Sequence, residues 1–302
     1  MSLENLCNIS SPCGEEKKIK EFLISELKEY TDSYFEDNFG NLVFNKKGSG
    51  EKICFECGTD EPFLSVSAAE EDKTRFMAPP QISVKGLIGR EMLSEGGKAF
   101  LLKSEKEPNE SRISQLYAEI SDLPLFEKCT LKPCYSETRE EISAFNLRYK
   151  APAFVMCEAV KSINKSDKDL YFAFTAQKCL GARGEKAMLE KYAFDEVISV
   201  LCVEKDKYFS PGCGAVIMAK DKRTPASVSV KNKLISAAKA EILDYKVGLS
   251  GENLYLSLPQ IMGECALSGC VGLVFDNNSI NRDKILKKDI ENITKLINSY
   301  CK

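Results

Sequence analysis

The strongest constraint on the fold of this chain is a regular change of pattern along its second half. After residue 145, apolar runs short enough to be strands alternate with segments whose apolar residues recur at helical spacing. The expected helices are 151–163, 184–192, 227–243 and 283–300, and the expected strands are 170–176, 197–203, 215–219 and 271–275. Such alternation predicts an α/β fold whose mixed central sheet is flanked by helices on both faces.

The first 140 residues predict an opening to the same sheet and then a different kind of domain. An amphipathic helix is expected from Glu15 to about Tyr30, and strands are expected at 42–45 and 53–57. From Leu64 to about Glu140 the strand-like pieces, such as 82–84 and 99–102, are short and broken by polar and Gly/Pro clusters. We therefore expect residues 1–65 and 141–302 to form the α/β domain, and residues 66–140 to form a small inserted β-rich domain.

The composition excludes several classes of protein. A chain of 302 residues with 43% hydrophobic and 29% charged residues can bury a large core without disulfide bonds. Its net charge of −3 gives no footprint for nucleic acid or a membrane surface, and no apolar run reaches the roughly 18 residues of a membrane span. Thirteen cysteines in a chain of this kind are expected to be reduced thiols, so we expect a cytoplasmic protein.

The chain contains no histidine, which limits its chemistry. Histidine is the side chain that titrates nearest neutral pH and the commonest zinc ligand. Catalytic triads and zinc sites that need histidine are therefore excluded. Any reaction must use Asp, Glu, Cys, Lys or backbone groups.

Charged and polar residues collect next to the predicted strand ends, where α/β sheets bind ligands. They are Asp60, Glu61, Asn146, Arg148, Lys178, Cys179 and Arg183. One interpretation is a charged cleft for a peptide or a small charged ligand. The alternative is an internal network of ion pairs, in which Lys178 lies opposite Asp60.

The order and spacing of these residues resemble the glutamyl aminopeptidase and cellulase-M-like family of dinuclear-metal exopeptidases. The resemblance runs from the segment 11–15 (Ser-Pro-Cys-Gly-Glu), through the Gln-x-x-x-Gly-x-Arg-Gly stretch at 177–184, to Asp289. It implies a zinc-exopeptidase-like fold with a β-rich insert used in assembly, and hence a homo-oligomer, dimeric at least. It also implies two metal ions held by two histidines and three acidic residues, beside a glutamate that acts as general base.

In this sequence, other residues stand at the positions to which the resemblance assigns that machinery. The two histidine positions fall on Gly58 and near Ser279, the bridging aspartate falls on Asn146, the base and its neighbouring ligand fall on Lys178 and Cys179, and the remaining acidic ligand falls on Leu201 or Cys202. A neutral amide cannot bridge two cations, and an ammonium group repels them. We therefore expect no catalytic residue and no metal cofactor, and a catalytically inactive, peptidase-like protein with a binding or assembly role.

Three alternatives remain open at this point. The chain could be an active aminopeptidase-type or glucanase-like metallo-hydrolase with an atypical site. It could be a thiol-based redox or ligand-binding protein, in which Lys178 or Arg183 lowers the pKa of Cys179. A third possibility is a rebuilt zinc site with Cys57, Cys179 and Cys202 as ligands.

Overall fold

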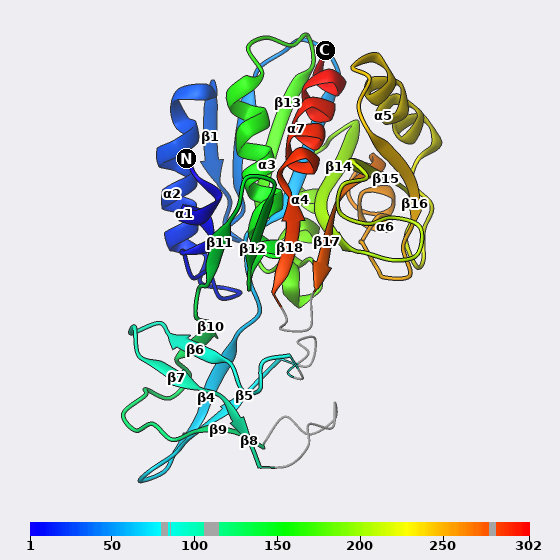
Figure 1. The fold of residues 1–302 in the computed structure, drawn as a ribbon. Coiled ribbons are helices and arrows are strands. Elements are labelled where there is room, and N and C mark those ends of the chain that lie inside the picture. The colour runs from blue at the N-terminus through cyan, green and yellow to red at the C-terminus, as the bar shows by residue number, and fades with distance from the viewer. Residues whose placement is uncertain (80–83, 85, 106–114, 278–281) are drawn as a thin grey trace.

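The computed structural model describes residues 1–79, 84, 86–105, 115–277 and 282–302. It contains an 11-stranded mixed sheet covered by helices, and a separate 7-stranded antiparallel sheet inserted between two strands of the first (Figure 1). The predicted fold class, a mixed α/β sheet with a β-rich insert, is therefore confirmed.

The centre of the large sheet is parallel. β13 (Asp169–Thr175), β3 (Lys52–Gly58), β14 (Glu196–Glu204) and β17 (Leu267–Asn277) lie side by side in this order. Their residues are mostly buried, as expected for parallel strands that are covered on both faces. Because the strands run in one direction, their carboxyl ends meet at one edge of the sheet, where the segments after β3 and β13 face each other.

Antiparallel strands extend this centre on both sides. On one side, β2 (Leu42–Lys46) pairs with β13 and β1 (Ser33–Glu36) with β2. On the other side, β17 pairs with both β18 (Asp283–Leu286) and β15 (Ala215–Lys220). The sheet continues from β18 to β12 (Glu141–Ala144) and then β11 (Tyr135–Glu137). From β15 it continues to β16 (Tyr245–Leu249).

Helices cover both faces of the large sheet. One face packs against α1 (Leu3–Cys7), α2 (Lys17–Leu27), α3 (Leu147–Ser162), α5 (Val228–Ala240) and α7 (Lys287–Cys301), and α3 and α7 run next to each other across it (Figure 1). The opposite face packs against α4 (Arg183–Lys191) and α6 (Ser257–Ile261). In α7 the buried residues recur at helical spacing, which is why this segment docks as a helix. The 3₁₀ turns η1 (Lys28–Tyr30) and η3 (Lys178–Leu180) complete the helical elements described.

The inserted sheet has its own core and extends away from the α/β domain (Figure 1). Its strands, in spatial order, are β7 (Ala99–Leu101), β6 (Glu91–Ser94), β10 (Lys128–Leu131), β4 (Leu64–Ala69), β5 (Thr74–Met77), β9 (Leu116–Ala118) and β8 (Lys103–Ser104). Phe76 and Phe100 stack in this core with ring centroids 4.9 Å apart. Of the strand expected at 82–84, residues 82 and 83 lie outside the described residues.

The predicted start of the closing helix is wrong. The closing helix was expected to begin at residue 283, but 283–286 form β18, which pairs with Glu141–Ala144, and α7 begins at Lys287. The strand pairing fixes an extended backbone where the local pattern alone favours a helix. Among the helices of the described residues, none has the length and apolar character that crossing a membrane requires.

Candidate functional site

The carboxylate of Asp60 joins the loops that follow β3 and β13. The backbone N–H groups of Lys178 and Cys179 donate hydrogen bonds to its Oδ1 and Oδ2 atoms, at 2.7 and 2.8 Å. The loop from β13 reaches this position through left-handed backbone conformations at Gln177 (φ 53°) and Ala182 (φ 55°). Asp60 is 2% exposed, so its charge is balanced inside the protein by backbone dipoles.

The ammonium group of Lys178 lies between two buried carboxylates. Its Nζ atom is 2.8 Å from Oε1 of Glu56, in β3, and 2.5 Å from Oε2 of Glu185, in the first turn of α4. Both glutamate side chains are fully buried, and the Lys178 side chain is 18% exposed. The predicted placement of the Lys178 side chain opposite Asp60 is therefore wrong, because that side chain pairs with Glu56 and Glu185 instead. The backbone of Lys178 binds Asp60, while its side chain reaches past Gly58 to the two glutamates.

Lys178, Glu56 and Glu185 form a buried triad in which one ammonium group faces two carboxyl groups. Burial alone would lower the pKa of Lys178, but the charges and hydrogen bonds of Glu185 and Glu56 outweigh it and raise that pKa. For Glu185, burial and the neighbouring Glu56 charge raise the pKa to about 7, although Lys178 acts in the opposite direction. The Oε1 atom of Glu185 is buried and has no hydrogen-bond partner among the described residues. One ammonium thus serves two carboxylates, and Glu185 keeps its proton to a higher pH than an ordinary glutamate does.

A second buried network surrounds Glu61. Its Oε1 atom accepts a hydrogen bond from the backbone N–H of Ser11 at 2.9 Å and lies 3.5 Å from Nζ of the fully buried Lys150. Its Oε2 atom accepts a hydrogen bond from Nδ2 of Asn146 at 3.0 Å. Asn146 also donates to the carbonyl oxygen of Cys7, and Lys150 donates to the Ser11 hydroxyl. The network ties α1 and α3 to the loop after β3.

The two arginines have separate surroundings. Arg148 donates from its Nε atom to both carboxylate oxygens of the buried Asp283, at 2.9 and 3.0 Å, and its guanidinium lies 4.1 Å from the ring centroid of Phe275. Arg183 is exposed at the beginning of α4, 5.8 Å from the ring centroid of Phe39. Arg148 therefore forms an ion pair with the buried Asp283, whereas Arg183 faces solvent.

The cysteines do not form the sites considered for them. Burial and the neighbouring Asp60 raise the pKa of Cys179 well above its usual value, so Lys178 and Arg183 do not activate this thiol. Among the described residues, the side chains that bring three ligand atoms within 4.8 Å of one another are Cys13, Glu16 and Asp60, so Cys57, Cys179 and Cys202 do not assemble a zinc site. All thirteen cysteines are free thiols.

The remaining positions singled out by the resemblance lie on the paired strands β3 and β14 or outside the described residues. Gly58 is the last residue of β3, and a Cβ atom there would lie 2.6 Å from Cβ of Lys178. Leu201 and Cys202 are half-buried residues of β14. Ser279 lies outside the described residues.

Sequence reasoning missed three charged residues of these networks. Glu56 could have been found from the sequence, because it is the one charged residue in the otherwise apolar run 53–57. A charge in a buried strand needs a partner of opposite charge. Glu185 and Lys150 carried no such signal, because charged residues are ordinary in helices. The partners of Lys150, Ser11 and Glu61, lie far away in the sequence, whereas Glu185 meets Lys178 only seven residues before it, across the turn η3.

Comparison with known proteins gives a consistent relationship. Residues 125–255 match the family model of the M42 glutamyl aminopeptidases. A curated protein of Acetivibrio thermocellus, which carries an inferred aminopeptidase name, is 25% identical over 265 residues, covering 81% of this chain and 80% of that protein.

Solved structures share the fold over nearly the whole chain. An aminopeptidase of the archaeon Desulfurococcus kamchatkensis superposes with a TM-score of 0.91 at 18% identity, covering 99% of this chain and 93% of that one. The TET1 peptidase of Pyrococcus horikoshii, described as assembling into a tetrahedron or a large octahedral shell, gives 0.88 at 21% identity, covering 99% and 98%. The chain is therefore similar to the M42 glutamyl aminopeptidases over residues 125–255, and it shares the fold of these solved aminopeptidases over nearly its whole length.

Proposed function

We propose that this chain keeps the fold of the family without its dinuclear hydrolase activity, and serves as a binding or assembly subunit. The observation that carries the proposal is the Lys178 ammonium held between Glu56 and Glu185, at 2.8 and 2.5 Å. The resemblance assigns position 178 to the general base. A lysine whose pKa is raised by two carboxylates stays protonated and cannot accept a proton at neutral pH.

The side chains at the family's metal-ligand positions do not fit a pair of divalent cations. Gly58 has no donor atom, and the space its side chain would need is taken by the stem of Lys178. Asn146 donates from its Nδ2 atom to Glu61 and to the Cys7 carbonyl, and its buried Oδ1 atom has no hydrogen-bond partner among the described residues, but this neutral amide carries no charge with which to bridge two cations. A fixed ammonium nearby further disfavours divalent cations. No hydrolytic step is therefore derived for this site.

The pairing of the charged residues also favours an assembly role over the capture of a charged ligand. Asp60 is occupied by two backbone N–H groups, Glu61 by Ser11, Asn146 and Lys150. A charged ligand would have to compete with these internal partners. By analogy with the assembly described for the TET1 peptidase, the proposal includes a homo-oligomer.

The test is an activity and assembly measurement on tag-free protein. Hydrolysis of leucyl and glutamyl p-nitroanilides and of short peptides is followed with zinc, cobalt or manganese added, and with EDTA. We expect no turnover above the rate without protein. Turnover that is abolished by EDTA and restored by metal would instead establish an active metallo-hydrolase. Light scattering during size-exclusion chromatography gives the molar mass, and a monomer at micromolar concentration would contradict the assembly role.

A further inference from the structure

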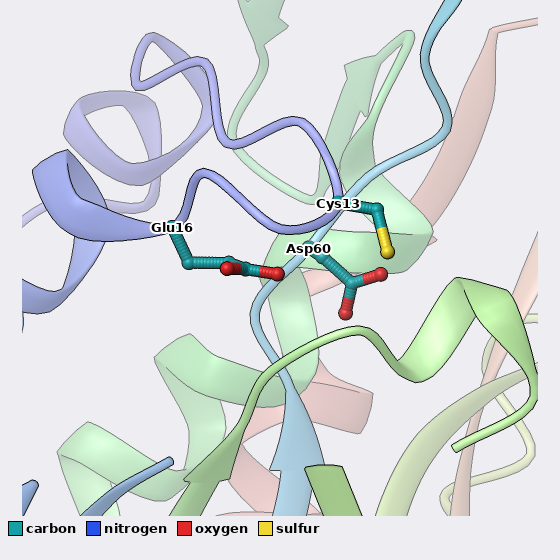
Figure 2. A group of neighbouring side chains, drawn as sticks. All are labelled: Cys13, Glu16 and Asp60. Atoms are coloured by element: carbon teal, nitrogen blue, oxygen red, sulfur yellow. The ribbon is translucent and has the colours of Figure 1, made fainter. Parts of the chain in front are cut away.

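Three buried side chains with metal-binding atoms converge next to the Lys178 triad (Figure 2). Cys13 comes from the loop before α2, Glu16 precedes the first residue of α2, and Asp60 follows β3. Their ligand atoms all lie within 4.8 Å of one another, and the three residues are 2%, 4% and 2% exposed. Figure 2 shows the Glu16 carboxylate and the Cys13 sulfur both directed toward the Asp60 carboxylate.

The backbone holds both carboxylates in fixed orientations. Oε1 of Glu16 accepts hydrogen bonds from the N–H groups of Gly14 at 2.7 Å and Gln177 at 3.1 Å. Both oxygens of Asp60 are held by the N–H groups after β13, as described above. Outer hydrogen bonds that fix the orientation of carboxylate ligands are a regular feature of protein metal sites. Each Asp60 oxygen accepts one of these bonds and keeps a second lone pair, whereas Oε1 of Glu16 accepts two, so Oε2 is the Glu16 atom left for a cation.

We propose that Cys13, Glu16 and Asp60 form a mononuclear binding site for a thiophilic divalent cation of the zinc and cadmium class. The donor set of one sulfur and two carboxylate oxygens suits such an ion, which takes four tetrahedral ligands and leaves one position for water. With bond lengths of about 2.0–2.3 Å, ligand atoms of a tetrahedral zinc site lie roughly 3.3–3.8 Å apart. Because the observed separations are 4.8 Å or less, they need a contraction of at most about 1.5 Å.

Binding is a simple exchange of a proton for a cation. Burial and the Asp60 charge raise the pKa of Cys13, so its thiol keeps the proton in the metal-free protein. On binding, the S–H bond breaks, a sulfur–metal bond forms, and the proton leaves to the buffer. The three anionic ligands exceed the charge of a divalent ion by one. The Lys128 ammonium donates to the Cys13 carbonyl at 3.0 Å and also pairs with Glu15 at 2.8 Å.

A cavity of about 400 Å³ adjoins the loop that carries Cys13. Pro12, Gly14 and Glu15 belong to its lining. None of the three proposed ligands stands at a position that the resemblance assigns to a ligand of the dinuclear centre, although the backbone N–H of Lys178 holds Asp60.

The test is a titration of metal-free, reduced protein with Cd²⁺, followed by ultraviolet absorbance of the cadmium–thiolate bond, and then displacement by Zn²⁺. We expect a saturating signal at one equivalent. It should be lost in Cys13→Ser, weakened by more than about 100-fold in Glu16→Gln, and retained in Cys265→Ser, which removes an exposed thiol. Circular dichroism verifies that each variant is folded.

Two results would overturn the proposal. One is the absence of a saturable signal in the parent protein, and the other is an unchanged signal and affinity in folded Cys13→Ser or Glu16→Gln. If Cys13→Ser does not fold, Glu16→Gln decides alone, because it keeps the size of the side chain and a carbonyl oxygen. A dinuclear centre would behave differently, binding two ions without a thiolate signal and supporting hydrolysis.

Discussion

Lys178 passes over Gly58 so closely that a side chain on residue 58 would meet it. A Cβ atom at position 58 would lie 2.6 Å from Cβ and 2.9 Å from Cγ of Lys178, closer than carbon atoms pack. The position of the Lys178 side chain is therefore compatible with glycine at position 58 and with no larger residue there. A histidine at 58, as the resemblance implies for the active relatives, would require the loop 177–184 to move.

Substitution of Gly58 by alanine tests this constraint. Because the added methyl group would overpack a half-buried position, we expect Gly58→Ala to lower the free energy of unfolding by about 1–3 kcal/mol. Urea denaturation measures it. Gly251→Ala is the control, since a Cβ there meets nothing within 4 Å, and it should stay within about 0.5 kcal/mol of the parent. Equal effects of the two substitutions would show that the close approach is absent in solution.

Removal of the Lys178 charge should be more damaging. Lys178→Met leaves Glu56 and Glu185 buried without their shared cation, and breaking such a pair from one side costs about 3–5 kcal/mol. Denaturation at pH 7.5 measures the loss. Lys17→Met, at a side chain 85% exposed, should change stability by less than about 0.5 kcal/mol. A loss below 1 kcal/mol for Lys178→Met would argue against a buried triad.

The triad also predicts a pH dependence of stability. The unfolded chain releases the Glu185 proton near pH 4.5, whereas the folded protein keeps it up to about pH 7. Between these values the folded state binds more protons, so this group's stabilising contribution, full below pH 4.5, is lost as the pH rises through 7. Glu185→Gln should remove that part of the slope, as measured by urea denaturation between pH 4.5 and 8. Glu190→Gln, on the exposed side of α4, should keep it.

Restoring a single acidic ligand should not restore metal binding at the dinuclear positions. Asn146→Asp removes the N–H donors to Glu61 and Cys7 and adds a carboxylate beside Glu61. We expect a loss of about 1–3 kcal/mol, and a zinc-induced shift in melting temperature no larger than in the parent. Asn232→Asp, on the exposed surface of α5, controls for the added charge. A larger zinc shift in Asn146→Asp would mean that most of the dinuclear site survives.

The long elements of the α/β domain could be predicted because their patterns are complete within the sequence. The buried residues of α7 recur at helical spacing, and β13 and β14 are apolar runs of strand length. Elements whose structure depends on a distant partner were missed or shifted. The segment 283–286 is a strand only because 141–144 lies beside it, and the short strand β16 exists through its pairing with β15.

For the candidate site, the sequence predicted which segments meet better than how their side chains pair. Asp60 and Lys178 were expected at adjoining strand ends, and their segments do touch. However, the side chain of Lys178 pairs with Glu56 and Glu185, and that of Arg148 pairs with Asp283. A side chain of four or five bonds can reach several partners around one backbone position, so strand order alone does not decide between them.

A positive charge carried on Lys178 differs from a bound ion in one thermodynamic respect. A bound ion is present in proportion to its concentration in the medium, so a site that relies on it empties when the ion is scarce. The Lys178 ammonium is covalently part of the chain and cannot dissociate from it. The balance of charge around Glu56 and Glu185 is therefore fixed once the chain has folded, whatever ions the surroundings supply.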